Sequence, residues 1–151
     1  ESMNQNILLA VDLESPVTTL VNYAAELAKA FEAKIYLVHI EQPEPDFIGY
    51  DAGPQYIRDQ RARELRKEHR YLQDLSNELH DQKIENEALL IAGTTVETLL
   101  EESQKLKADL IIAGTHKHSF MYNAFVGSTS AELFRRANIP FLGIPLRDVK
   151  S

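Results

Sequence analysis

A glycine-bounded segment late in the chain has the backbone and side chains best suited to hold an anion. Gly114 follows an apolar run at residues 108–113, and Gly127 precedes Ser128 and Thr129 at the start of an expected helix. A helix N-terminus offers free N–H groups and a partial positive charge, and a glycine lets a phosphate approach the backbone closely. The two hydroxyl groups can add hydrogen bonds. The pattern predicts a phosphate site, and its structural alternative is a turn followed by an N-cap.

Asp12 is a second polar group expected at the same edge of the molecule. It closes the apolar run 6–12, which we interpret as a buried parallel strand. In open parallel sheets, ligands bind beyond the carboxyl ends of the strands, where the strand order reverses. Asp12, Ile40 and Gly114 each end a predicted strand and are therefore expected to meet there. The alternative role for Asp12 is to cap the turn that follows it.

A His-x-His pair in the same loop is the one metal-like motif of the sequence. His116 and His118 flank Lys117, whose positive charge disfavours a bound cation. Asp12 is the only candidate for a third ligand. We therefore expect no metal site.

The elements that position these groups alternate along the chain. Apolar runs predict strands, and apolar residues at helical spacing predict the helices between them. The expected strands are residues 6–12, 34–40, 87–92, 108–113 and 140–145, and the expected helices are residues 16–31, 55–81, 94–103 and 128–136. Strict alternation of five strands and four helices predicts an α/β fold, a doubly wound parallel sheet with right-handed crossovers.

The long helix expected at 55–81 is mostly charged. Its sparse apolar stripe consists of Ile57, Leu65, Leu72, Leu75 and Leu79. The mixed charges of residues 58–70 are expected to form a solvated face, and His69 and His80 are expected to be solvated as well. His39 lies instead in an apolar strand, where we expect a hydrogen-bonded core histidine.

Length and composition limit the class of protein. The 151 residues fit one domain, expected at 3–148, with Glu1 and Ser2 as a probable tag remnant. A net charge of −7 argues against nucleic acid or an anionic membrane as the main partner. The absence of cysteine excludes disulfides and thiolate chemistry and suits a cytoplasmic protein.

The loop and the strand-end aspartate together resemble the universal stress protein family, over essentially residues 3–148. The family motif is Gly, two residues, Gly, nine residues, then Gly-Ser/Thr, and here Gly114, Gly127 and Ser128 match it. The resemblance implies an open sheet in the order 3-2-1-4-5, similar to the adenine nucleotide alpha hydrolase fold. It also implies a homodimer through the last strand, residues 140–145.

The same resemblance implies a binding site for an adenine nucleotide (ATP, ADP or AMP), with Mg²⁺ if a triphosphate is bound. Asp12 would contact the nucleoside, and Ile40 would cover the adenine. The residues implied for the site are Ala10, Val11, Asp12, Ile40, Ala113, Gly114, Lys117, Gly127, Ser128 and Thr129.

Lys117 departs from the motif, because it stands where the family has its middle glycine. Forms without that glycine occur in a branch not thought to bind ATP, and residues 145–148 resemble that branch too, although Gly127-Ser128 is retained. If a left-handed backbone is needed, lysine costs roughly 1 kcal/mol or somewhat more. If the backbone must touch the triphosphate, the side chain blocks it. The ammonium group could instead neutralise a phosphate.

The leading hypothesis is a non-catalytic stress-response or signalling module that an adenine nucleotide could gate. No Gly-Lys-Ser/Thr of the Walker type is present, and no base that would activate water is evident beside the loop. Two alternatives remain open. One is slow Mg²⁺-dependent ATP hydrolysis with Asp12 orienting the metal, and the other is a ligand-free dimeric adaptor whose degenerate site is filled by Lys117.

Overall fold

The computed structural model describes residues 5–11, 17–41, 55–93, 95–114 and 139–145. In chain order its elements are β1 (Asn6–Ala10), α1 (Val17–Phe31), β2 (Lys34–Glu41), α2 (Gln55–Asp81), β3 (Asn86–Ala92), α3 (Thr95–Lys105), β4 (Leu110–Gly114) and β5 (Phe141–Ile144). All neighbouring strands are parallel, in the order β3-β2-β1-β4-β5, which confirms the predicted sheet. Three of the four expected helices are seen, and the fourth, 128–136, lies outside the described residues.

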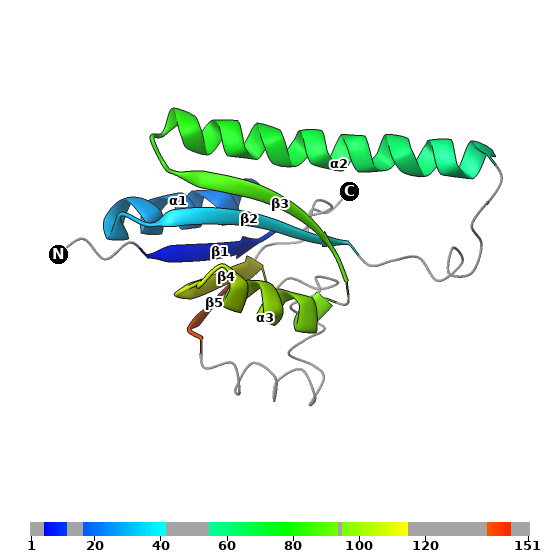
Figure 1. Ribbon diagram of the computed structural model, residues 1–151. Coiled ribbons are helices and arrows are strands. Elements are labelled where there is room, and N and C mark those ends of the chain that lie inside the picture. The colour runs from blue at the N-terminus through cyan, green and yellow to red at the C-terminus, as the bar shows by residue number, and fades with distance from the viewer. Residues whose placement is uncertain (1–4, 12–16, 42–54, 94, 115–138, 146–151) are drawn as a thin grey trace.

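The helices form layers on both faces of the sheet. Figure 1 shows α1 and α2 on one side and α3 on the other. Apolar residues of α1 and α2 pack with alternate positions of β1 and β2, such as Leu9 and Leu37. The intervening positions, such as Leu8 and Val38, pack with Leu99 of α3. The near-continuous apolar strands follow from this burial on both faces.

The long helix α2 follows its expected pattern. Leu72, Leu75 and Leu79 are buried against the sheet, whereas His69 and His80 are exposed, as predicted. Figure 1 shows α2 alongside β3, with its amino-terminal part extending past the carboxyl ends of the strands. Within the described part of the chain, none of the helices has the length and apolarity that a bilayer crossing requires.

Each described helix ends in a tight turn that contains a non-glycine residue with positive φ. These residues are Glu32, Lys83 and Lys107, with φ of 54°, 63° and 54°. In each turn the amide of the following residue donates to a carbonyl five positions back, as from Ala108 to Ser103 at 2.8 Å. That is the Schellman pattern. It explains why the fourth strand begins at Leu110 rather than at the predicted residue 108, since Ala108 completes the helix end.

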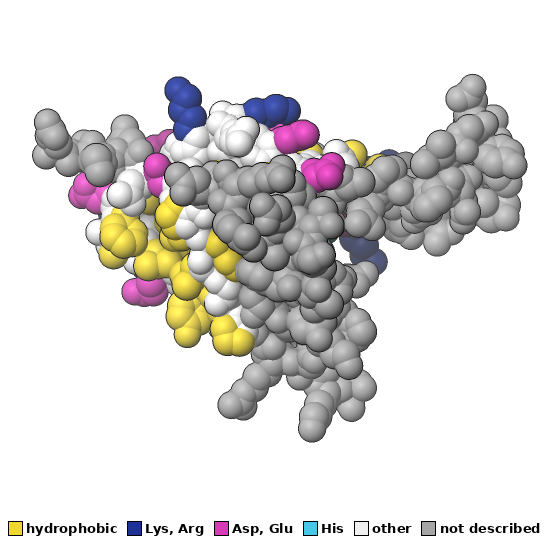
Figure 2. All heavy atoms as spheres, turned by 90° about the horizontal axis from the view of Figure 1, so that it is seen from below, with side chains coloured by type: hydrophobic (Ala, Val, Ile, Leu, Met, Phe, Trp, Pro, Cys, Tyr) yellow, Lys and Arg dark blue, Asp and Glu magenta, His cyan; other side chains and the backbone are white. Residues whose placement is uncertain are grey.

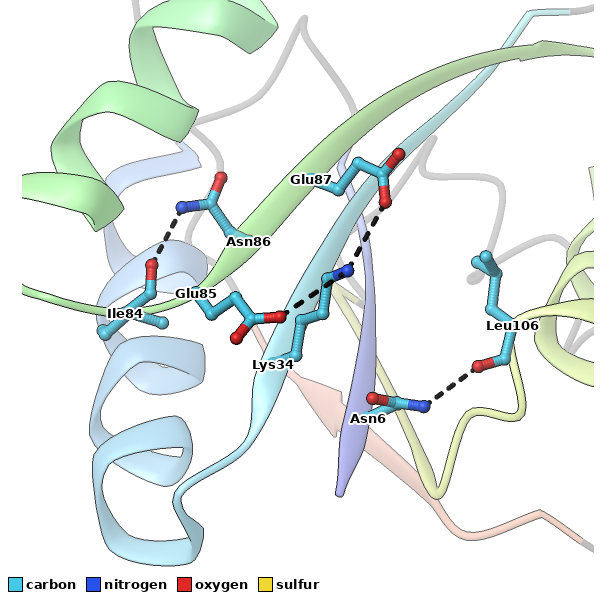
Figure 3. A network of polar contacts seen from close by, with 7 residues as sticks. All are labelled: Asn6, Lys34, Ile84, Glu85, Asn86, Glu87 and Leu106. Carbon is cyan, nitrogen blue, oxygen red and sulfur yellow. Dashed lines mark hydrogen bonds and ion pairs between the residues drawn. The ribbon is translucent and has the colours of Figure 1, made fainter. Parts of the chain in front are cut away.

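A polar network joins the starts of the strands at the amino edge of the sheet (Figure 3). The backbone amide of Asn6 donates to Asp109 Oδ2 at 2.9 Å, and the Asp109 amide donates to the Asn6 carbonyl at 2.7 Å. The Asn6 side chain donates to the Leu106 carbonyl at 3.1 Å. These bonds fasten β1 to the turn that precedes β4, at the edge opposite the candidate site.

Lys34 is the cation of this network. Its ammonium group lies 3.5 Å from Glu87 and 3.8 Å from Glu85, and it stands 4.6 Å from the ring centre of Tyr36. A side-chain hydrogen bond with Tyr36, and then the negative charges nearby, raise the pKa of Lys34 above its ordinary value of 10.5, against an opposing effect of burial. Lys34 is therefore a charged anchor between β2 and β3.

Candidate functional site

A row of small residues crosses the sheet near its carboxyl edge. Ala10 of β1 is paired with Val38 of β2 on one side and with Ala113 of β4 on the other, and Ala113 is paired with Gly143 of β5. Ala10, Val38 and Ala113 all belong to the core cluster on the α3 face. From β1 to β5 this face therefore carries two methyl groups and then a glycine.

The row lies where the order of the sheet reverses. From β1 the chain passes to β2 and β3 on one side, and it then returns to β4 and β5 on the other. Ligands of open parallel sheets bind at this reversal, beyond the carboxyl ends of the two central strands. Ala10 and Ala113, both predicted as site residues, form the last residue pair of β1 with β4.

Ile40 stands one step nearer the carboxyl edge than this row. It is two residues beyond Val38 on β2, so it lies on the same α3 face, roughly 7 Å further along the strand. It is 8% exposed and is paired with Ile91 of β3. Ile40, Ala10 and Ala113 thus form one continuous buried apolar surface at this end of the sheet.

Val11 lies at the predicted place but faces the other way. Its side chain is buried in the cluster formed with α1 and α2, opposite Ile40 and Ala113. Its amide donates to the Val38 carbonyl at 2.9 Å. Val11 therefore offers a ligand neither its side chain nor this amide, and its role is to hold the end of β1.

His39 of β2 supports Val11 from the same side. Its Nδ1 atom lies 3.0 Å from the Val11 carbonyl oxygen, and its side chain is only 16% exposed. This confirms the expected hydrogen bond, whereas the ring is partly buried and belongs to neither buried core cluster. A carbonyl oxygen only accepts, so Nδ1 carries the proton in this bond.

Glu68 is a residue that the sequence reasoning missed. Its Oε2 atom, on α2, lies 4.0 Å from Nε2 of His39, and its side chain is 27% exposed. It was expected in a solvated run of charges. The signal that could have found it is spacing, because Glu68 falls three residues after Leu65 and four before Leu72, within the apolar stripe.

Gly93 follows the carboxyl end of β3 and lies close to the side chain of Thr98. A Cβ atom built there would collide with the side chain of Thr98 on α3. Absence of a side chain is therefore a packing requirement, since it lets the first turns of α3 pack against the strand end.

The remaining predicted site residues lie outside the described residues: Asp12, Lys117, Gly127, Ser128 and Thr129. The same is true of His116 and His118, the pair considered for metal. Among the residues that the structure describes, no group of three metal-binding side chains is found. The predicted residues that the structure describes are thus Ala10, Val11, Ile40, Ala113 and Gly114, all at the carboxyl ends of β1, β2 and β4, and of these Val11 faces away from the candidate site.

Known proteins are similar to this chain in sequence and in fold. A universal stress protein of Thermus aquaticus is 30% identical over 142 residues, which are 93% of this chain and 98% of the relative. A structure from the universal stress protein family of Burkholderia pseudomallei is 26% identical, with a TM-score of 0.66 over 97% of this chain and 99% of that one. A universal stress protein family structure from Arabidopsis thaliana with AMP bound is 18% identical, with a TM-score of 0.63 over 95% and 92% of the two chains.

The family model named "Universal stress protein family" matches residues 3–145. The match runs from the start of β1 through β5, so it includes all five strands and the strand ends that form the candidate site. The chain belongs to the universal stress protein family.

Proposed function

We propose that the chain binds an adenine nucleotide at the carboxyl edge of β1, β2 and β4. The observation that carries this proposal is the row of small residues, Ala10 and Ala113, with Ile40 beside it on the same face. Small apolar side chains at the reversal of strand order, beside the larger side chain of Ile40, favour a flat base as the ligand. The AMP in the Arabidopsis structure of the same fold supports this class of ligand.

The other parts of the nucleotide are assigned to residues that follow these strand ends in the sequence. Asp12, directly after Val11, would accept hydrogen bonds from the ribose hydroxyls. Gly114, at the end of β4, begins the loop that would lead to the phosphates. Gly127, Ser128 and Thr129 would bind them by backbone amides and hydroxyl groups.

Lys117 would neutralise a phosphate of the bound nucleotide. ATP is the triphosphate that this site would take, and Mg²⁺ would then accompany it. Lys117→Gly restores the family motif and separates two possibilities. A charge contact predicts weaker binding of ADP in the variant, whereas a steric block predicts tighter binding. Isothermal titration of both proteins with ADP measures the difference.

The function is that of a non-catalytic stress-response module controlled by nucleotide occupancy. The sequence holds no Walker-type Gly-Lys-Ser/Thr from which a hydrolytic site would be built. A single-turnover assay with radiolabelled ATP, excess protein and Mg²⁺ tests this point. We expect no ADP above the protein-free control, and cleavage that disappears in Asp12→Ala would mean a hydrolase.

Bound nucleotide can be sought directly. Purified protein is denatured, and the released small molecules are separated by chromatography and identified by mass. We expect an adenine nucleotide in the wild type and a much smaller amount in Asp12→Ala prepared in parallel. Equal amounts in the two proteins would contradict the role given to Asp12.

We also propose a homodimer through the last strand. β5 is at one end of the described sheet, and Leu142 on it is 37% exposed. Figure 2 shows hydrophobic side chains gathered on the face seen from below, the side on which β5 lies in Figure 1. An apolar edge strand tends to pair with a second chain. Sedimentation should give a dimer at micromolar concentration and a monomer for Leu142→Lys.

Two further expectations remain proposals. The domain is taken as residues 3–148, and limited proteolysis followed by mass measurement should leave a stable fragment close to these bounds. The location is taken as cytoplasmic, which fractionation of cells that express the chain at its native level would test.

A further inference from the structure

A histidine and a carboxylate meet behind the end of β1, on the face away from the proposed nucleotide. His39 precedes Ile40 on β2, and successive side chains of a strand point to opposite faces. Ile40 packs on the α3 face, whereas His39 reaches Glu68 of α2 on the other. A ligand beside Ile40 would therefore not touch His39.

The His39 imidazole continues the hydrogen bonding between β1 and β2 beyond the last backbone pair of the two strands. The last residue pair of these strands is Ala10 with Val38. Just beyond it, the Val11 amide donates to the Val38 carbonyl at 2.9 Å, and the Val11 carbonyl accepts from Nδ1 of His39 at 3.0 Å. Both backbone polar groups of Val11 are thus bound to β2, one by backbone and one by a side chain.

This bond bears on Asp12 through covalent geometry. The Val11 carbonyl belongs to the peptide unit that joins Val11 to Asp12, and a peptide unit is planar. A bond to the carbonyl oxygen therefore restricts rotation of the whole unit.

A carboxylate lies near the second nitrogen of the imidazole. Nε2 of His39 lies 4.0 Å from the buried Oε2 of Glu68, and α2 holds Glu68 in place because Leu72, one turn later, is fully buried. This distance is too long for a hydrogen bond, and the contact is an ion pair only when both ring nitrogens carry a proton.

We infer that His39 is a positioning residue, which fixes the plane of the peptide unit that follows Val11 and so sets the direction in which the chain leaves β1 toward the proposed nucleotide site. The inference rests on the proposed function for the identity of the ligand. The hydrogen bond from His39 to the Val11 carbonyl does not depend on that function. Glu68 is the residue that orients the ring.

Substitutions at position 39 separate the hydrogen bond from packing. In His39→Asn the amide nitrogen occupies the place of Nδ1, so the donor to Val11 is retained. In His39→Gln the amide is one carbon further out, and His39→Leu has no donor. We expect ADP affinity about tenfold lower for Leu and Gln and within about threefold of wild type for Asn.

A second measurement does not depend on nucleotide. The backbone ¹⁵N shift of Asp12 reports on the Val11 carbonyl, because both belong to one peptide unit. In the ligand-free protein it should move in His39→Leu and His39→Gln and remain near the wild-type value in His39→Asn. Thermal unfolding of all variants shows how much of any loss of affinity is loss of folded protein.

The outcomes are distinct. The inference is overturned if His39→Asn binds ADP no more tightly than His39→Leu does. It is also overturned if the ¹⁵N shift of Asp12 is the same in His39→Leu as in the wild type. If wild-type protein binds no ADP, the proposed function fails, and the Asp12 shift alone decides whether His39 holds this peptide. Glu68→Gln should resemble wild type, because an amide can still contact the ring, whereas Glu68→Leu should shift Asp12 in the same direction as His39→Leu.

Discussion

Ala10 of β1 and Ala113 of β4 are paired across the two central strands, and both methyl groups lie on the face covered by α3. Both side chains are buried, at 2% and 1% exposed. The two alanines therefore put small side chains into the packed layer at the reversal of strand order, which is the place where ligands of open parallel sheets bind.

Ala113→Val should therefore weaken nucleotide binding more than it weakens folding. The added methyl groups project onto the face assigned to the base, so we expect at least about a tenfold loss of ADP affinity. Overpacking should lower the free energy of unfolding by about 1–3 kcal/mol. The matched control is Ala108→Val, since Ala108 packs against the same cluster but precedes β4 at the amino edge. Equal loss of affinity in both variants would contradict this placement of the site.

Gly93→Ala should destabilise the junction between β3 and α3. The new methyl group would collide with the side chain of Thr98, so we expect a loss of about 1–3 kcal/mol in urea unfolding. The double variant Gly93→Ala with Thr98→Ala removes the colliding atoms and should recover most of this loss relative to Thr98→Ala alone. A loss that persists unchanged in the double variant would assign it to another cause.

Lys34→Met tests the network at the amino edge through its pH dependence. The pKa of Lys34 is raised above 10.5 in the folded protein, so its stabilisation is fully present below that value and is lost as pH rises through the folded pKa. Because Glu85 and Glu87 are exposed, Lys34→Met should lower the free energy of unfolding by at most about 1 kcal/mol near neutral pH. The difference between the variant and the wild type should shrink in strong alkali. Lys29→Met, on exposed α1 surface, is the control and should show no such trend.

Lys83→Gly should stabilise the protein. Lys83 has φ of 63°, a conformation that costs a residue with a Cβ about 1–2 kcal/mol but costs glycine almost nothing. Greater freedom of glycine in the unfolded chain removes about 0.4–1 kcal/mol of this gain. A net rise of about 0.5–1 kcal/mol in the free energy of unfolding is expected, and a fall would mean that the Lys83 side chain makes a contact worth more than the strain.

The strands could be predicted from the sequence because they are buried on both faces, and their order was implied by the resemblance to the universal stress protein family. Runs such as ILLA at 7–10 and LIIA at 110–113 are apolar without interruption, and helical spacing separates them. Because these runs are uniformly apolar, the sequence does not indicate which residue of one strand pairs with which residue of the next. That Ala10 faces Ala113 rather than a neighbour emerged only from the structure.

Helix ends and side-chain pairs were the less predictable features. A glycine usually marks the residue with positive φ at the end of a helix. Here these positions are occupied by Glu32, Lys83 and Lys107, so no such signal was present in the sequence. The contact of His39 with Glu68 joins residues 29 positions apart, on a strand and a helix whose relative placement the sequence does not fix. A histidine in a buried strand and a carboxylate in an apolar helix stripe are each unusual, and together they indicate two side chains that lie near each other.

Isothermal titration of the wild-type protein with ADP tests the central claim most directly. Starting material is unfolded and refolded to remove any bound nucleotide, and Ala113→Val is titrated under the same conditions. The account predicts saturable heat with a Kd well below millimolar for the wild type and a marked loss in the variant. No heat from the refolded wild type at millimolar ADP, ATP or AMP would contradict it.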